Sequence, residues 1–119
     1  METPKTILVV DDERPILLLY EQELREEGYH VVVADNARTA VERLEEIRPD
    51  LVVLDIRMPG MDGLEALAQI LDRDDKPAVI INSAYSSYKD NFMSWAADAY
   101  VVKSSDVSEL KTTIKKLIG

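Results

Sequence analysis

The sequence predicts an α/β fold in which five parallel strands alternate with five helices, written (βα)5, within a single domain of residues 1–119. Five short apolar runs, rich in Val and Ile, recur along the chain and do not alternate with polar residues, which is typical of strands buried on both faces. The gaps between the runs are too long for hairpins and fit helical crossovers. Because such crossovers are right-handed, we expect a doubly wound sheet with helices on both faces.

The expected strands begin, in chain order, at Ile7, Val31, Leu51, Ala78 and Ala99. Their order within the sheet does not follow from the pattern alone. The flavodoxin-like order 2-1-3-4-5 would place the first and third strands side by side, where the strand order reverses. We adopt that order because it brings together the acidic residues that follow these two strands.

The first two helices have clear ends in the sequence. Pro15 suits the first turn of the first helix, which stops near Gly28. Asn36 can cap the second helix, and Pro49 blocks its continuation. Their apolar stripes are Leu17, Tyr20 and Leu24 in the first helix, and Ala37, Ala40, Val41, Leu44 and Ile47 in the second.

The remaining three helices are less uniform. The third follows the turn Asp62-Gly63, and the fourth, around Tyr88 to Ala97, has the weakest pattern. The fifth opens at Asp106, with Glu109 three residues on as in a capping box. The apolar stripes are Leu64, Leu67, Ala68 and Leu71 in the third helix, and Val107, Leu110, Ile114 and Leu117 in the fifth.

Composition argues against several classes of function. With 46% hydrophobic residues in regular runs, the chain can bury a core and is not expected to be disordered. It has no cysteine, so a disulfide or thiolate metal site is impossible, which is compatible with a reducing cytoplasm. No apolar stretch approaches the roughly 20 residues that span a bilayer, and the first residues lack a signal-peptide core. The net charge of −9 argues against nucleic-acid binding, which needs clustered Lys and Arg.

Acidic or reactive side chains follow four of the five runs. They are Asp11 and Asp12 after the first run, Asp55 after the third, Ser83 after the fourth and Lys103 after the fifth. Since the carboxyl ends of parallel strands meet at one edge, where open α/β sheets hold ligands, we expect these residues to converge. Three carboxylates in one crevice repel each other unless a cation and an anion complete the arrangement.

This set of residues fits the transfer of a phosphoryl group. Nearby carboxylates suit a hard cation, above all Mg²⁺, which binds through one or two carboxylates plus phosphate oxygens. One Asp could then act as nucleophile and form an aspartyl phosphate. Mg²⁺ and Lys103 would hold the equatorial oxygens, and the Ser83 hydroxyl could donate to the same group.

Each of these residues also has an ordinary explanation. A single Asp after a strand is usually a turn or cap residue, Ser83 alone would be a loop or cap residue, and Lys103 alone a solvated side chain. Tyr100 lies in an apolar run and would by default be core. The pair Asp11 and Asp12 is less ordinary, because the second charge gains nothing from a single cap. The joint placement at four strand ends favours the functional interpretation.

With these residues in place, the chain resembles the receiver domain of bacterial two-component response regulators, from Ile7 to Leu117. The matching motifs are Val9-Val10-Asp11-Asp12-Glu13, Leu54-Asp55-Ile56-Arg57-Met58-Pro59-Gly60-Met61-Asp62-Gly63, Ser83-Ala84, and Tyr100 with Lys103 three residues on. The second of these motifs is very specific. The fold of this family is the five-stranded one expected above.

The resemblance implies a phosphoacceptor signalling protein, which catalyses only its own phosphotransfer and dephosphorylation. Asp55 would take the phosphoryl group. Asp12 would ligate Mg²⁺ directly and Asp11 through water, with the backbone carbonyl of Arg57 as a further ligand. Lys103 would bridge to the phosphoryl group.

The resemblance also implies a switch and its partners. Ser83 would move to hydrogen-bond the phosphoryl group and Tyr100 would turn inward behind it, which would remodel the face made by the fourth helix, fifth strand and fifth helix. The donor would be a phosphohistidine on a sensor histidine kinase or a histidine phosphotransfer protein, and the output a downstream protein target. Phe92, Met93 and Trp95 lie on or near that face, as core or as contact residues.

Two features depend on this chain's own residues. Ser104 follows Lys103 where the family usually has a proline preceded by a cis peptide bond, and since a non-proline cis bond costs about 3 kcal/mol, we expect a trans bond. Arg57, Ala84 and Tyr85 would flank the phosphoryl group. Because Arg57 and Tyr85 are bulky, we expect them to obstruct the attacking water and slow self-dephosphorylation.

Other classes fit the sequence less well. A flavodoxin-like flavin carrier shares the fold, but Asp11-Asp12-Glu13 would repel a flavin phosphate. A dinucleotide enzyme would need G-x-G-x-x-G after the first strand, which is absent. A phosphatase of the haloacid dehalogenase type would need an Asp where Arg57 stands. Two alternatives stay open: a pseudo-receiver that binds partners without phosphorylation, and the N-terminal receiver of a longer transcriptional regulator in place of a stand-alone receiver.

Overall fold

The computed structural model describes residues 3–55, 63–83, 97–104 and 106–119. Its five parallel strands form one sheet in the order β2-β1-β3-β4-β5, which confirms the predicted order. The strands are β1 (Thr6–Val10), β2 (His30–Ala34), β3 (Leu51–Leu54), β4 (Ala78–Ser83) and β5 (Ala99–Val102). All five apolar runs of the sequence are therefore strands.

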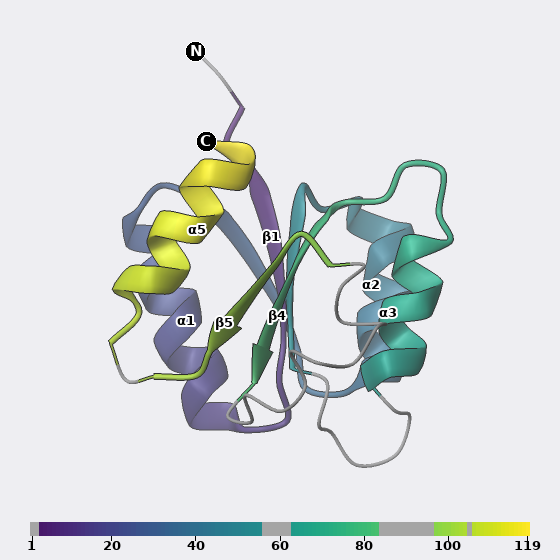
Figure 1. Ribbon diagram of the computed structural model, residues 1–119, viewed down its shortest axis with the longest axis horizontal. Coiled ribbons are helices and arrows are strands. Elements are labelled where there is room, and N and C mark those ends of the chain that lie inside the picture. Colours follow the sequence, from purple (N-terminus) through teal and green to yellow (C-terminus); the bar gives the residue numbers. More distant parts are fainter. Residues whose placement is uncertain (1–2, 56–62, 84–96, 105) are drawn as a thin grey trace.

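Helices cover both faces of the sheet, as expected (Figure 1). On one side lie α1 (Arg14–Glu26) and α5 (Ser108–Ile118), and on the other α2 (Ala37–Ile47) and α3 (Gly63–Leu71). The helix predicted around residues 88–97 lies outside the described residues, apart from its last position. In the described part of the chain, no helix is both long enough and apolar enough to cross a membrane.

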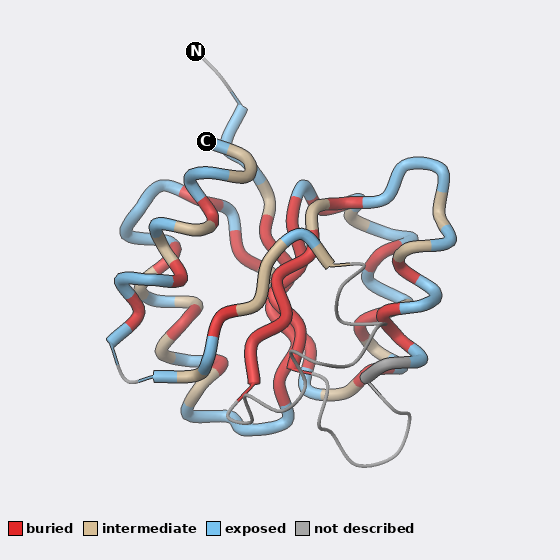
Figure 2. The backbone as a smooth tube through the Cα atoms, viewed as in Figure 1, coloured by how far each residue is buried: buried red, intermediate tan, exposed pale blue. Residues whose placement is uncertain are grey.

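The core consists of two layers, one on each face of the sheet. Successive β1 residues alternate between them: Ile7 and Val9 pack with α1 and α5, while Leu8 and Val10 pack with α2 and α3. All four are at most 1% exposed, and the central strands are buried along their length (Figure 2). Burial on both faces explains why these strands read as continuous apolar runs.

The ends of the first two helices follow the signals in the sequence. Pro15 lies in the first turn of α1, and the chain leaves that helix through Gly28, whose φ of 98° favours glycine. The Asn36 side chain accepts a 2.8 Å hydrogen bond from the Thr39 N–H and caps α2. Arg48 ends α2 in the left-handed region at φ 45°, since the proline that follows disfavours the helical conformation there.

Two details of the later helices differ from the predictions. Ala68 is exposed, and the buried stripe of α3 includes Ala66 and Ile70 beside Leu67. A small alanine fits either face of a helix, so its apolar character does not fix the orientation.

The predicted capping box of the fifth helix is not formed, because the N-cap residue is Val107, which makes no side-chain cap hydrogen bond. The Asp106 carboxylate accepts from the Ser108 N–H at 2.9 Å. However, the Asp106 N–H donates to the Ser104 hydroxyl at 3.1 Å and not to the exposed Glu109 side chain. Asp106 is thus held by Ser104 and Ser108, one residue before the cap, and Glu109 takes no part.

Candidate functional site

The sheet brings the predicted residues to one edge by extending its hydrogen bonds one residue beyond the strands. The Asp11 N–H donates to the Ala34 carbonyl at 3.1 Å, and the Asp55 N–H to the Val10 carbonyl at 3.0 Å. The Lys103 N–H likewise donates to the Ser83 carbonyl at 2.9 Å. The backbone of each residue is therefore fixed by the neighbouring strand.

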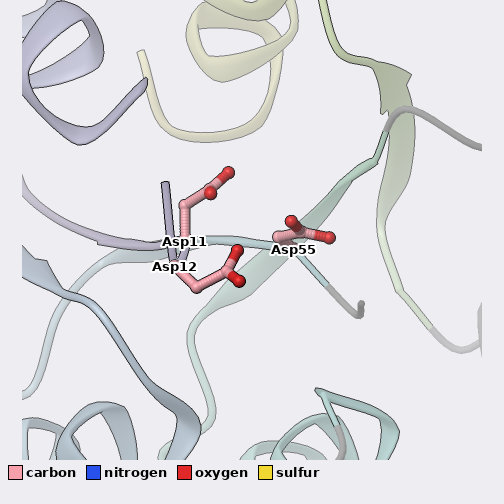
Figure 3. Close-up of side chains that lie close together, drawn as sticks. All are labelled: Asp11, Asp12 and Asp55. Atoms are coloured by element: carbon pink, nitrogen blue, oxygen red, sulfur yellow. The ribbon is translucent and has the colours of Figure 1, made fainter. Parts of the chain in front are cut away.

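Three carboxylates meet at this edge (Figure 3). Asp11, Asp12 and Asp55 each offer an oxygen atom, and these oxygens lie within 4.8 Å of one another. Asp11 and Asp55 are only 2% and 4% exposed, whereas Asp12 is open to solvent. An all-oxygen cluster of this kind can hold a hard divalent cation.

Lys103 reaches across the sheet edge to the two buried carboxylates. Its Nζ lies 2.7 Å from Asp11 Oδ2 and 2.8 Å from Asp55 Oδ2, and 3.7 Å from the exposed Glu13. The lysine side chain is 11% exposed, so water screens these pairs little. Asp11, Asp12, Asp55 and Lys103 together carry a formal charge of −2, which a single divalent cation would balance.

The charges in this cluster shift the pKa values of its members. Burial raises the pKa of Asp11, although Lys103 and the Glu13 N–H act in the opposite direction. Burial by itself would lower the pKa of Lys103, but hydrogen bonds and charges from Asp11 and Asp55 outweigh it and hold that pKa above its usual value. Lys103 is therefore a permanent cation at neutral pH.

The predicted switch residues occupy two neighbouring strands. Ser83 is the last residue of β4 and is fully buried, and Tyr100 is half-buried on β5, packed against the core layer beneath α2 and α3. No described peptide bond is cis, so the Lys103–Ser104 bond is trans, as expected. Arg57, Ala84 and Tyr85 lie outside the described residues, as do Phe92, Met93 and Trp95.

Sequence reasoning missed three contacts around this site. The Glu13 N–H donates to Asp11 Oδ1 at 2.8 Å and so orients that carboxylate. The Tyr20 hydroxyl donates to Asn82 Oδ1 at 2.7 Å, and Asn82 Nδ2 donates to the Val101 carbonyl at 2.9 Å. The signal was present: a tyrosine on a buried helix stripe and an asparagine in an apolar strand both need a polar partner.

The chain belongs to the response regulator receiver domain family, whose pattern matches residues 7–115. The five-stranded sheet and the cluster of Asp11, Asp12, Asp55 and Lys103 agree with that membership. The resemblance drawn from the sequence motifs is thus confirmed.

Solved structures of similar proteins agree with this family assignment. The chain is 46% identical to the response regulator TrrA from Thermotoga maritima, crystallised with Mg²⁺ and BeF (TM-score 0.91; 96% of this chain and 99% of that one covered). A structure of histidine kinase ThkA in complex with TrrA matches at 46% identity, with a TM-score of 0.88 and coverage of 97% and 99%. A CheY-like receiver domain protein from Methanospirillum hungatei is 32% identical, with a TM-score of 0.89 and coverage of 96% and 93%.

Proposed function

We propose that this receiver domain takes a phosphoryl group onto Asp55 and passes the signal on through a change of its surface. The observation that supports this most directly is the approach of Lys103 to two buried carboxylates at 2.7 and 2.8 Å. One of these carboxylates would be the nucleophile, and the ammonium group is placed to hold the group that arrives there. Membership in the receiver family supports the same assignment.

Mg²⁺ is the proposed cofactor, and the donor set fits it. Asp12 is exposed and has no hydrogen bond or ion pair with any other described residue, so it suits direct ligation. Asp11 already accepts from the Glu13 N–H with one oxygen and from Lys103 with the other, which suits ligation through water. Asp55 and the carbonyl of Arg57 would complete the protein ligands. Bound Mg²⁺ would neutralise carboxylate charge and help orient the phosphoryl oxygens.

The transfer itself requires little from the protein beyond position and charge. A carboxylate oxygen of Asp55 attacks the phosphorus of a phosphohistidine on a sensor histidine kinase or a histidine phosphotransfer protein. As the new O–P bond forms, the N–P bond breaks and its electron pair returns to the imidazole ring. Lys103 stays charged and moves from the carboxylate to a phosphoryl oxygen. The structure of ThkA with TrrA supports a histidine kinase as donor.

The proposed output is a change in the face that would be made by the predicted fourth helix, β5 and α5. Ser83 donates its hydroxyl to the phosphoryl group and Tyr100 turns inward, so that phosphorylation shifts an existing equilibrium between two surfaces. Arg57, Ala84 and Tyr85 would flank the phosphoryl group. A downstream protein binds the altered face in the cytoplasm, and the domain itself contacts neither DNA nor membrane.

In this proposal residues 1–119 are one receiver domain, and the protein acts as a signalling phosphoacceptor, catalysing only its own phosphotransfer and dephosphorylation. The acidic net charge of −9 supports protein partners over nucleic acid. The domain would serve equally in a stand-alone regulator or at the head of a longer one.

The test is the intact mass of the protein after incubation with acetyl phosphate and Mg²⁺. We expect one added phosphoryl group in the wild type and none in Asp55→Asn, which keeps the shape of the side chain. Lys111→Ala, which removes an ion pair between α5 and Glu23 of α1, is the control and should be phosphorylated like the wild type. Purified histidine kinase with ATP is the second donor.

Equal labelling of wild type and Asp55→Asn would contradict Asp55 as the acceptor. Failure of both donors to label the wild type, together with no change in urea midpoint on adding Mg²⁺, would favour a pseudo-receiver that binds partners without phosphorylation.

A further inference from the structure

A buried chain of hydrogen bonds joins α1 to the last two strands beside the phosphorylation site. The Tyr20 hydroxyl donates to Asn82 Oδ1 at 2.7 Å, and Asn82 Nδ2 donates to the Val101 carbonyl at 2.9 Å. Tyr20 and Asn82 are each only 2% exposed. In the sequence, Asn82 directly precedes Ser83, and Val101 stands two residues before Lys103.

The direction of these hydrogen bonds is fixed by chemistry. Burial raises the pKa of Tyr20, so its hydroxyl keeps its proton and can donate. The Val101 carbonyl can only accept, so the Asn82 amide must turn its Nδ2 toward β5 and its Oδ1 toward α1. Without the Tyr20 hydroxyl, the buried Oδ1 would lose this partner and the amide would lose its fixed orientation.

Lys103 lies two residues after the Val101 end of this chain of hydrogen bonds, and its side chain must be placed accurately. β5 lies at the end of the described sheet, with β4 as its neighbour there, and Asp55 and Asp11 follow strands β3 and β1 further along. Since neighbouring strands are about 4.8 Å apart, two to three strand spacings separate the backbone of Lys103 from the backbones of Asp55 and Asp11, and an extended lysine is needed to meet their carboxylates. A small displacement of the end of β5 would therefore move Nζ away from both carboxylates.

The end of β5 borders a pocket that is partly open to solvent. This pocket, of about 130 Å³, lies between β5 and the start of α5 and is lined in part by Tyr20, Asn82, Val101 and Leu110. On this side, fewer side chains pack against the strand than in a filled core. The hydrogen bond from Asn82 to the Val101 carbonyl supplies a restraint at this point, in addition to the strand ladder.

We propose that Tyr20 and Asn82 are positioning residues, which hold the end of β5 so that the Lys103 ammonium group stays on Asp11 and Asp55. The predicted effect on phosphotransfer rests on the proposed function. The predicted effect on the placement of Lys103 does not rest on it and can be measured without a phosphoryl donor.

The experiment compares Tyr20→Phe, which removes only the hydroxyl, with the wild type and with Tyr29→Phe. Tyr29 is a matched control because it is also buried, at 8% exposure, in the same core layer. Two quantities are measured: the initial rate of labelling by acetyl phosphate with Mg²⁺, and the ¹⁵N NMR resonance of the Lys103 ammonium group, assigned through its loss in Lys103→Arg.

We expect Tyr20→Phe to slow labelling about tenfold, because misplacing a group by about 1 Å can cost up to roughly 100-fold. It should also shift or broaden the Lys103 resonance. Tyr29→Phe should change the rate less than twofold and leave the resonance in place, since its hydroxyl is remote from the site.

The double variant Tyr20→Phe/Asn82→Val distinguishes two explanations: that these residues position Lys103, or that Tyr20→Phe only destabilises the fold by leaving a buried polar atom unpaired. Replacing both partners with apolar side chains removes the unpaired Asn82 Oδ1, so the urea midpoint should recover in part, while the Val101 carbonyl loses its Asn82 donor. The labelling rate and the Lys103 resonance should stay altered, because the hydrogen bond from Asn82 to Val101 is removed.

Recovery of both rate and resonance in the double variant would overturn the inference, and so would an unchanged Lys103 resonance in Tyr20→Phe. If the wild type accepted no phosphoryl group, the proposed function would fail, but the resonance would still decide whether Tyr20 and Asn82 place Lys103.

Discussion

Replacing Lys103 with methionine should destabilise the domain by an amount that depends strongly on pH. The substitution keeps an unbranched apolar stem and removes the charge that lies 2.7 Å from Asp11 and 2.8 Å from Asp55. Both carboxylates are nearly inaccessible to water, at 2% and 4% exposure. Breaking a buried ion pair by removing one partner typically costs about 3–5 kcal/mol.

The structure also sets an upper limit on this cost. Lys103 supplies one positive charge, and a proton on one of the two carboxylates would replace it. Holding an aspartate of ordinary pKa 3.8 protonated at pH 7 requires about 4 kcal/mol, and at pH 5 less than about 2 kcal/mol. We therefore expect a loss of about 3–4 kcal/mol at pH 7 that falls to less than about 2 kcal/mol at pH 5.

The sign follows from the direction of the pKa shift. In the variant, the pKa of Asp11 is raised by burial and by Asp55 without the opposing effect of Lys103. A carboxyl whose pKa is raised by folding favours the folded state at low pH and loses that contribution as pH rises through the folded-state pKa. The variant should therefore approach the wild type as the pH falls toward the ordinary aspartate value.

The assay is urea unfolding of wild type and variant at pH 7 and pH 5, followed by circular dichroism with EDTA present. Lys111→Met is the control, since its ion pair with Glu23, at 3.2 Å, is more open to water, and it should lose much less stability. An equal loss for Lys103→Met at both pH values, or a loss below about 1 kcal/mol at pH 7, would refute the reasoning.

Three further predictions concern other parts of the chain. Asn36→Ala should lower the free energy of unfolding by about 1 kcal/mol in urea titrations, because the Thr39 N–H at the start of α2 loses its acceptor. Folding raises the pKa of Lys103. The contribution of Lys103 to the free energy of unfolding should therefore be complete below the ordinary lysine pKa of 10.5 and should decrease as the pH rises above that value. Thermal unfolding at alkaline pH measures this decrease. Arg57→Ala and Tyr85→Ala should each speed decay of the phosphorylated protein, and unchanged decay rates in both would contradict the predicted obstruction of water.

The strands and the converging acidic residues were predictable because they follow from simple periodicities. A strand buried on both faces must be continuously apolar, so its end is visible where the first charge appears. Parallel strands then place those charges at one edge, which is why Asp11, Asp55 and Lys103 could be grouped before their distances were known.

Other features depend on three-dimensional detail that no periodicity carries. Ala68 fits the apolar stripe of α3 in the sequence but is exposed, because alanine has little preference for either side of a helix. Asp106 and Glu109 match a capping box in the sequence, yet the helix is capped at Val107 without a side-chain hydrogen bond. Tyr20 was correctly placed in the core, but the partner of its hydroxyl is 62 residues away in sequence. Such a contact becomes visible only when the strands are packed together.

The contacts of Lys103 suggest how a chemical change at Asp55 would reach the surface. Lys103 pairs with two buried carboxylates, so its removal is predicted to destabilise the fold, and in the proposed function it must leave one of them for a phosphoryl oxygen. Since Lys103 directly follows β5, a shift of its side chain would act on the end of that strand and on the Ser104–Asp106 hydrogen bond that precedes α5. The ion pairs of Lys103 are thus the contacts that phosphorylation would rearrange, so in the proposed function stability and signalling would depend on the same side chain.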